Sequence, residues 1–344
     1  MKNNFQNIAK TALILIYLVI VAGAVVRMTG SGMGCPDWPK CFGYLIPPTE
    51  RAQLEWQEGR AYEEGQVIIY NENLKVASKD FTTGSTYEES NWKPYIKHDY
   101  AVFNAFHTWT EFINRLIGAL AGLATLLMAI ASFGYWRKNK KITLLSWTVV
   151  FGMVFQAWLG AKVVYSVLQP VKITIHMVAA LVLVALVLYI ISSSRELKKG
   201  FVYNSKFYAG LWLALLLTML QVILGTQVRQ FVDDQIDQVG ELAKNLWLQD
   251  PNVQFYIHRS FSIVVLALNV LLFFQYKKLK LGYHKMNWVL LLLLSEILTG
   301  ILMYYVDFPF LSQPLHLVIA SLLFGVQFYL VLEALEAKKQ RETL

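Results

Sequence analysis

Charged residues are scarce in this chain, and histidine and cysteine are scarcer still. Only 16% of the 344 residues are charged while 56% are hydrophobic, and there are six histidines and two cysteines. This hydrophobic share is high for a soluble domain. Apolar runs of about 18 to 22 residues recur along most of the sequence, and each is long enough to cross a bilayer. The composition excludes an ordinary soluble protein and predicts a polytopic helical membrane protein.

The net charge of +8 does not predict nucleic-acid binding, because the basic residues gather in short segments between the apolar runs. These segments are residues 137–141, 195–199, 277–280 and 338–341. Under the positive-inside rule they are cytoplasmic, and Lys2 and Lys10 place the N-terminus on the same side. We therefore expect a multi-pass cell-membrane protein with both termini in the cytoplasm.

Eight spans are predicted, at residues 11–28, 105–135, 143–165, 171–192, 207–228, 254–275, 287–306 and 314–335. The first run is too long for the core of a signal peptide, and no small-residue cleavage motif follows it directly, so we expect it to be retained. With both termini inside, the long, Glu-rich segment 29–104 lies outside. It is too polar to enter the membrane, and we expect a small extracytoplasmic cap.

The spans repeat as two sets of four. Three segments match in register between the sets: 23–27 with 225–229, 112–115 with 256–259, and 160–176 with 300–316. Because each set has an even number of spans, the repeats are parallel and are related by an axis along the membrane normal. The expected fold is all-α, with two parallel four-helix-bundle repeats at residues 1–200 and 201–344.

Four of the histidines lie at the outer ends of the even-numbered spans: His107, His176, His258 and His316. A lone histidine at a membrane interface is more often a polar anchor, but one on every even span favours ligation by at least one pair. Zinc usually needs a third or fourth donor, and the sixth span has no nearby carboxylate. Two imidazoles from facing helices instead suit the axial positions of a haem in an apolar bundle.

Arginine also occurs at the outer mouths, where the positive-inside rule disfavours it. The four residues are Arg27, Arg115, Arg229 and Arg259. Each of them can snorkel to lipid phosphate instead. A pair at matching places in each repeat nevertheless favours haem propionates as their partners.

Cys35 and Cys41 flank a short, proline-containing loop directly after the first span. The outer compartment is oxidising, so we expect a disulfide, and the intervening residues are enough to close such a loop. Free thiols and a redox-active pair remain as alternatives.

Glu111 is the only carboxylate in the mouth of the second span, on the same helix face as His107 and Asn114. As a structural residue it would cap the helix or pair with Arg115. As a functional residue beside a haem it would move a proton or stabilise a developing positive charge, and this interpretation is favoured. Glu296 lies deeper, in the seventh span, and the sequence gives it no role.

The stretch GAVVRMTGSGMGCPDWPKC at residues 23–41, together with the eight spans and the mouth histidines, resembles the haem A synthase family. The resemblance implies an enzyme that oxidises the C8 methyl of haem O to a formyl group by successive hydroxylations, giving haem A for cytochrome c oxidase. It implies a low-spin haem B cofactor ligated by His258 and His316. It also assigns Glu111 as an essential glutamate and His176 to the substrate half.

The chain departs from the family at Asn114, because the second helix of the family usually reads Glu-x-x-His-Arg. On a straight helix His107 lies roughly 10 Å further out than Asn114 and too far out to pair with His176. We therefore expect the substrate haem to be held chiefly by His176, with His107 a ligand only if the helix breaks near Asn104. The segment 29–104 is also long for the family.

Two other functions remain open. One is a dihaem cytochrome b that passes electrons from quinol, and the other is a haem transporter or chaperone. Glu111 favours the enzyme, because a pure electron carrier needs no carboxylate at the mouth of its site. The expected partners are haem O and membrane lipid; haem O synthase is one option for a protein partner, and the sequence does not identify the protein that delivers haem O. The sequence identifies neither the electron acceptor nor the oligomeric state, for which a homo-oligomer is one option.

Overall fold

The computed structural model describes residues 2–97, 102–166, 168–195 and 200–342. The cytoplasmic lysines expected at 198 and 199 lie outside the described residues. Eight of the described helices are long and apolar enough to cross a membrane, which confirms the predicted polytopic fold. They are α1 (Lys2–Met28), α2 (Ala105–Ala131), α3 (Lys140–Tyr165), α4 (Pro170–Ser193), α5 (Ser205–Val239), α6 (Val253–Lys278), α7 (Met286–Tyr305) and α8 (Ser312–Glu342).

The helix ends follow local capping chemistry. The side chains of Asn104, Asn204 and Asn252 accept backbone N–H groups at the starts of α2, α5 and α6. Pro170 occupies the first turn of α4, where its missing N–H costs nothing. Helix α5 continues well past the predicted end of its span, and it ends only at Gly240, whose φ of 91° suits glycine.

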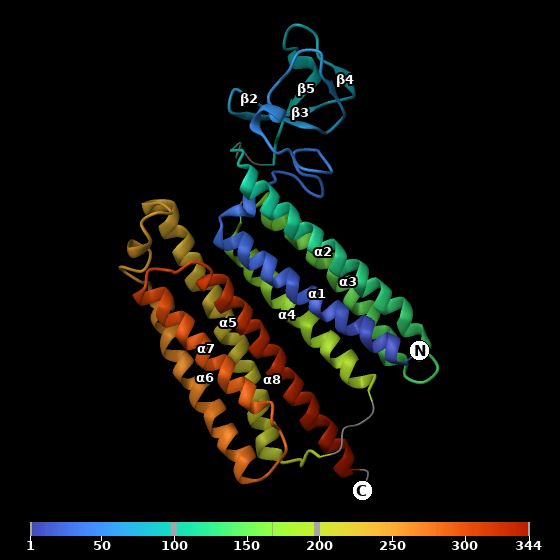
Figure 1. The fold of residues 1–344 in the computed structure, drawn as a ribbon, viewed down its shortest axis with the longest axis vertical. Coiled ribbons are helices and arrows are strands. Elements are labelled where there is room, and N and C mark those ends of the chain that lie inside the picture. Colours follow the sequence, from blue (N-terminus) through green and yellow to red (C-terminus); the bar gives the residue numbers. More distant parts are fainter. Residues whose placement is uncertain (1, 98–101, 167, 196–199, 343–344) are drawn as a thin grey trace.

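Figure 1 shows the helices in two groups of four, α1–α4 and α5–α8. Within each group neighbouring helices contact one another, and the groups meet where α4 and α8 lie against α5 and α1. Gly152 and Gly210 permit close approach, because a Cβ there would lie 2.5 and 2.6 Å from Leu183 and Leu272. The proposed division into repeats at 1–200 and 201–344 stays a prediction.

Helix α1 begins and α8 ends at the side of the bundle away from the extramembrane cap (Figure 1). The buried side chains form two main clusters, each drawn mostly from one group of helices. Phe5, Ile16, Met128 and Val187 belong to the first, and Phe207, Leu272 and Leu330 to the second. This arrangement puts the polar outer ends of α2, α4, α6 and α8 at the capped side.

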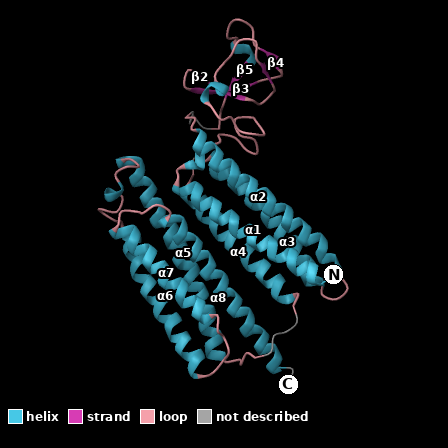
Figure 2. Ribbon diagram, viewed as in Figure 1, coloured by secondary structure: helices cyan, strands magenta, loops and turns pink. Residues whose placement is uncertain are grey.

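The cap is built from short antiparallel strands, which the sequence analysis did not predict (Figure 2). They are β1 (Ala61–Tyr62), β2 (Val67–Tyr70), β3 (Asn73–Ala77), β4 (Phe81–Thr82) and β5 (Trp92–Pro94), paired as β2-β3-β5 and β1-β4. Asn71 and Glu72 both have positive φ, as a tight hairpin turn between β2 and β3 requires. Short 3-10 helices lie at Ser31–Met33, Arg51–Leu54, Glu89–Asn91, Ser132–Tyr135 and Lys244–Leu246.

An aromatic cluster fills the cap. The ring of Trp92 lies edge-on to Tyr62 and Phe81, at centroid distances of 5.0 and 5.2 Å. Tyr70 and Tyr87 stack at 3.9 Å. A sheet this small needs such anchors, because two- and three-stranded pieces are marginal without a packed face.

Candidate functional site

The loop after α1 lies over the outer end of α2. Cys35 and Cys41 form a disulfide with a Cα–Cα distance of 4.9 Å. Thr108 on α2 donates its hydroxyl hydrogen to the carbonyl of Gly34 at 2.7 Å. A Cβ at Gly34 would lie 2.4 Å from the carbonyl oxygen of His107, so only glycine lets the loop lie this close to the helix. We call residues 34–43 the disulfide loop.

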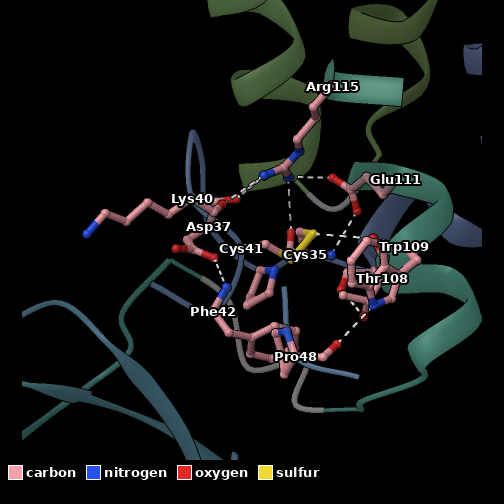
Figure 3. The surroundings of a disulfide bond; sticks show 12 residues. Cys35, Asp37, Lys40, Cys41, Phe42, Pro48, Thr108, Trp109, Glu111 and Arg115 are labelled. Atoms are coloured by element: carbon pink, nitrogen blue, oxygen red, sulfur yellow. Dashed lines mark hydrogen bonds and ion pairs between the residues drawn. A yellow bond between two sulfur atoms is a disulfide. The ribbon is translucent and has the colours of Figure 1, made fainter. Parts of the chain in front are cut away.

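Glu111 is buried beneath this loop, with only 4% of the residue exposed. Its Oε2 accepts the backbone N–H of Cys35 at 2.8 Å, and its Oε1 lies 2.5 Å from Nη2 of Arg115 (Figure 3). Both carboxylate oxygens therefore have charged or polar donors. A carboxylate held in this way has a fixed direction and does not need water to satisfy it.

Arg115 connects the same carboxylate to the loop. Its Nη1 donates to the carbonyls of Asp37 and Lys40 at 2.7 and 2.9 Å, and Nη2 donates to that of Cys35 at 3.4 Å. The sequence analysis predicted a propionate partner here. In the structure the guanidinium lies among loop carbonyls, which carry no sequence signal, and the propionate partner stays a prediction.

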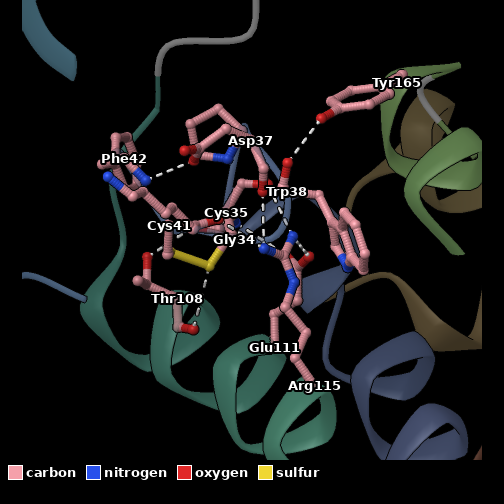
Figure 4. A network of polar contacts seen from close by, with 12 residues as sticks. Gly34, Cys35, Asp37, Trp38, Cys41, Phe42, Thr108, Glu111, Arg115 and Tyr165 are labelled. Atoms are coloured by element: carbon pink, nitrogen blue, oxygen red, sulfur yellow. Dashed lines mark hydrogen bonds and ion pairs between the residues drawn. A yellow bond between two sulfur atoms is a disulfide. The ribbon is translucent and has the colours of Figure 1, made fainter. Parts of the chain in front are cut away.

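Asp37 folds the disulfide loop back on itself. Its carboxylate accepts the backbone N–H of Phe42 at 2.5 Å and that of Gly43 at 2.8 Å (Figure 4). Burial raises the pKa of the Asp37 carboxyl, while these two N–H groups and the charge of Arg115 act in the opposite direction. At the end of α3, Tyr165 donates its hydroxyl to the carbonyl of Trp38 at 3.1 Å.

His107, Asn114 and His176, which the sequence predicts near the substrate, lie in the N-terminal group of helices. His107 is half-buried in the first turn of α2, two turns outward from Asn114. Helix α2 begins at Ala105 and has Asn104 as its N-cap. No helical turn directly precedes Asn104 among the described residues, so the helix has no break at this point. In the part of the chain that the structure describes, no hydrogen bond or ring contact joins His107 to His176.

Three buried polar atoms in this group have no hydrogen-bond partner among the described residues: Oδ1 of Asn114, Oε1 of Gln156 and Nδ1 of His176. Gly160 lies against the His176 ring, since a Cβ there would be 3.8 Å from Cε1. Orphaned buried polar atoms are uncommon in folded proteins and mark places where a ligand or water completes the bonding.

In the C-terminal group, His258 and His316 face each other. Their ring centroids lie 6.3 Å apart, with an angle of 70° between the ring planes. A metal bound between two imidazoles places the ring centres roughly 6 Å apart, from bonds of about 2 Å and about 1 Å from nitrogen to ring centre. The spacing of the two rings therefore fits one iron atom between them, as the haem prediction requires.

The surroundings of these two rings differ. Nδ1 of His316 lies 2.8 Å from the hydroxyl oxygen of Thr299 and 3.0 Å from Oε2 of Glu296. Nδ1 of His258 is buried and has no hydrogen-bond partner in the described residues. Gly225 lies under the His258 ring, because a Cβ there would be 3.2 Å from Cε1.

A carboxylate without a predicted role joins the two groups of helices on the side of the cap. Asp233 on α5 lies 2.8 Å from Nη2 of Arg27 and 2.7 Å from Nη1 of Arg229. The i,i+4 spacing of Arg229 and Asp233 is the available signal in the sequence, but the predicted span ends at residue 228, before both residues. Arg259 lies over the rings of Phe255 and Tyr256 and makes no ion pair within the described residues.

Comparison with known proteins adds independent information. The family model COX15-CtaA, described as cytochrome oxidase assembly protein, matches residues 6–84 and 84–328. The chain is 24% identical to a haem A synthase of Wolbachia pipientis over 92% of this chain and 88% of the relative. It is 22% identical to a haem A synthase of Listeria welshimeri over 96% of this chain and 95% of the relative. A haem A synthase of Bartonella quintana is 25% identical, with 77% of this chain and 73% of the relative covered.

Proposed function

The chain belongs to the COX15-CtaA family of cytochrome oxidase assembly proteins, and on that premise we propose that it is a haem A synthase. In this proposal it oxidises the C8 methyl of haem O to a formyl group by successive hydroxylations, as an integral enzyme of the cell membrane. The observation that carries haem chemistry is the separation of 6.3 Å between the rings of His258 and His316. This separation is close to the spacing of two imidazoles that share one iron.

We assign the cofactor to the C-terminal half, residues 201–344. His258 and His316 would hold a haem B through their ring nitrogens, with Arg229 and Arg259 near its propionates. Bound there, haem B supplies a one-electron redox centre. Apolar side chains of α5–α8 form the main buried cluster of this half.

We assign the substrate to the N-terminal half, residues 1–200. The orphaned Nδ1 of His176 and Oδ1 of Asn114 support a polar ligand in this group. Haem O would enter laterally, with its farnesyl tail in the lipid. His176 is the chief ligand of its iron in this scheme, and Arg27 and Arg115 are assigned to the substrate side as partners of its propionates.

Glu111 is the residue we assign to catalysis. Each oxidation of the methyl removes protons as well as electrons, so the site needs a group that can stabilise positive charge or accept a proton. The donors from Cys35 and Arg115 fix the direction of the carboxylate and hold it beneath the disulfide loop. The loop thus shields the carboxylate from bulk water.

The orientation that goes with this function has both termini in the cytoplasm and the site at the outer face. It is supported by the placement of the α1 start and the α8 end opposite the cap (Figure 1). Haem O synthase is one option for the donor of substrate, and an electron acceptor must take the electrons released. A homo-oligomer is compatible with the proposal.

The pigments that the full-length protein carries test this function against its rivals. The protein is produced together with haem O synthase, purified, and its haems are extracted and separated. A haem A synthase yields haem B together with haem O or haem A. Haem B alone would favour a dihaem cytochrome b, and failure to convert bound haem O would favour a haem transporter or chaperone.

A further inference from the structure

Three helices repeat one small arrangement around a histidine. Glycine lies against the ring in each case, and a long polar side chain stands four residues before the glycine. The three sets are Gln156, Gly160 and His176; Gln221, Gly225 and His258; and Glu296, Gly300 and His316. The arrangement is the same, but only the third set has a carboxylate.

The polar side chains also bind differently. Gln156 donates its amide to the carbonyl of His176 at 3.1 Å, and Gln221 donates to the carbonyl of His258 at 2.8 Å. These glutamines contact the histidine backbone and leave the ring Nδ1 without a partner. Glu296 instead places Oε2 3.0 Å from Nδ1 of the His316 ring itself.

Thr299 fixes the position of the hydrogen on Nδ1 of His316. Its hydroxyl lies 3.0 Å from the carbonyl oxygens of both Ser295 and Glu296, so its hydrogen points back into the helix. The hydroxyl oxygen is then an acceptor towards Nδ1, as the Glu296 carboxylate also is. Two acceptors around one ring nitrogen require that nitrogen to carry the hydrogen, which leaves Nε2 of His316 free to bind a metal.

We propose that Glu296 is a positioning residue that makes His316 the stronger of the two axial ligands of haem B and lowers the reduction potential of that haem. The inference rests on the proposed haem B site. A carboxylate that accepts the Nδ1 hydrogen of a ligating imidazole raises the basicity of the ligand and fixes the orientation of its ring. A more basic ligand stabilises the ferric state, and hydrogen bonding to the ligand is a recognised control of haem potential.

The consequence is an asymmetric pair of ligands. His316 is oriented by an anion, while His258 has no side-chain hydrogen bond to its ring nitrogen in the described residues. The side chain of Glu296 is only 13% exposed, so its interaction with the ring is little screened by solvent. The matching places on α3 and α5 carry glutamine, which gives a natural substitution for the test.

The primary test is Glu296→Gln in the full-length protein in lipid nanodiscs. Haem content, the midpoint potential of the low-spin haem and its electron paramagnetic resonance are measured. We expect haem B to be retained, its midpoint potential to rise and its g-values to change. Thr299→Val, which keeps the carboxylate, is the matched control, and its shift is expected to be smaller. An unchanged potential and spectrum in Glu296→Gln would overturn the proposal.

A second experiment leaves Glu296 intact. It tests the role of Glu296 even if the Glu296→Gln variant loses its haem. His316→Gly is supplied with imidazole or with 1-methylimidazole, which has no N–H to donate. The imidazole form should have the lower potential. His258→Gly, treated in the same way, should show no such difference. An equal difference in both variants, or none in His316→Gly, would refute the role of Glu296.

These outcomes are separate from the failure of the proposed function. If the wild-type protein holds no low-spin haem B, the cofactor assignment itself is wrong. If the wild type holds this haem while neither experiment shifts its potential, only the role of Glu296 is wrong.

Discussion

The backbone N–H of Cys35 lies 2.8 Å from Oε2 of Glu111, so the disulfide and the proposed catalytic carboxylate are directly connected. Arg115 strengthens this connection, because it binds Oε1 of Glu111 and the carbonyl of Cys35 with the same guanidinium. A change in the loop therefore reaches Glu111 through one hydrogen bond.

Replacing Glu111 with Gln removes the negative charge but keeps an oxygen for the N–H of Cys35. We expect conversion of haem O to fall on the order of a hundredfold, the lower end of the range for loss of a general acid or base. Haem B should be retained. The measurement is the ratio of haem A to haem O extracted from the purified variant. Wild-type conversion would show that Glu111 only caps the loop.

Replacing both Cys35 and Cys41 with Ser should lower stability by about 2 kcal/mol, since the closed loop is short. It should also reduce haem A formation more than haem B content, because the loop lies over Glu111 and not over the C-terminal histidines. Thermal unfolding and haem extraction measure the two effects. Equal loss of both haems would indicate a global defect in folding.

His258→Ala and His316→Ala should each abolish the low-spin haem B spectrum. Each variant removes one of two rings that are spaced for a single iron atom. Reduced-minus-oxidised absorption of the purified proteins is the measurement. His284→Ala, at an exposed position between α6 and α7, is the matched control and should have the normal spectrum. A normal spectrum in both of the first two variants would exclude this site.

His107→Ala should leave the coordination of bound haem O unchanged. His107 lies two turns outward from Asn114 on an unbroken helix, too far out to pair with His176. The variant is loaded with haem O and examined by electron paramagnetic resonance, with His176→Ala as the variant expected to lose the substrate signal. A change from six- to five-coordinate haem O in His107→Ala would identify it as the missing ligand.

Asp233→Asn should destabilise the protein by about 2 kcal/mol, because Arg27 and Arg229 would then face each other without an anion. Both arginines are largely buried, so solvent screens them only partly. The measurement is the thermal unfolding temperature in detergent. Asp237→Asn, on an exposed turn of the same helix, is the control and should have no effect.

The membrane spans were predictable because apolar runs of that length have few other uses. Their ends were not, since capping by Asn104 or Asn252 depends on single side chains. Helix α5 continues into a polar segment because the i,i+4 pair of Arg229 and Asp233 supports it there. The helix therefore ends at Val239 and not at residue 228, where the predicted span ends.

The candidate site was predictable in its residue types and less so in its contacts. The mouth histidines stand out in a chain with few histidines, and the facing of His258 and His316 agrees with that interpretation. The donors of Arg115 go to backbone carbonyls, which no side-chain pattern reports. The role of Glu296 depended on the packing of α7 against α8, which sequence spacing alone does not fix.

The cap leaves and rejoins the membrane part at nearly the same point. The cap begins after Phe42, whose ring lies 5.8 Å from the ring of Phe103, just before α2. Tyr95, near the end of the cap, donates its hydroxyl to the carbonyl of Pro36. A segment with adjacent ends is a module that can be exchanged without reshaping its host. Replacing it with a short linker would yield a minimal enzyme, and grafting another domain there would attach a chosen partner beside the mouth of the site.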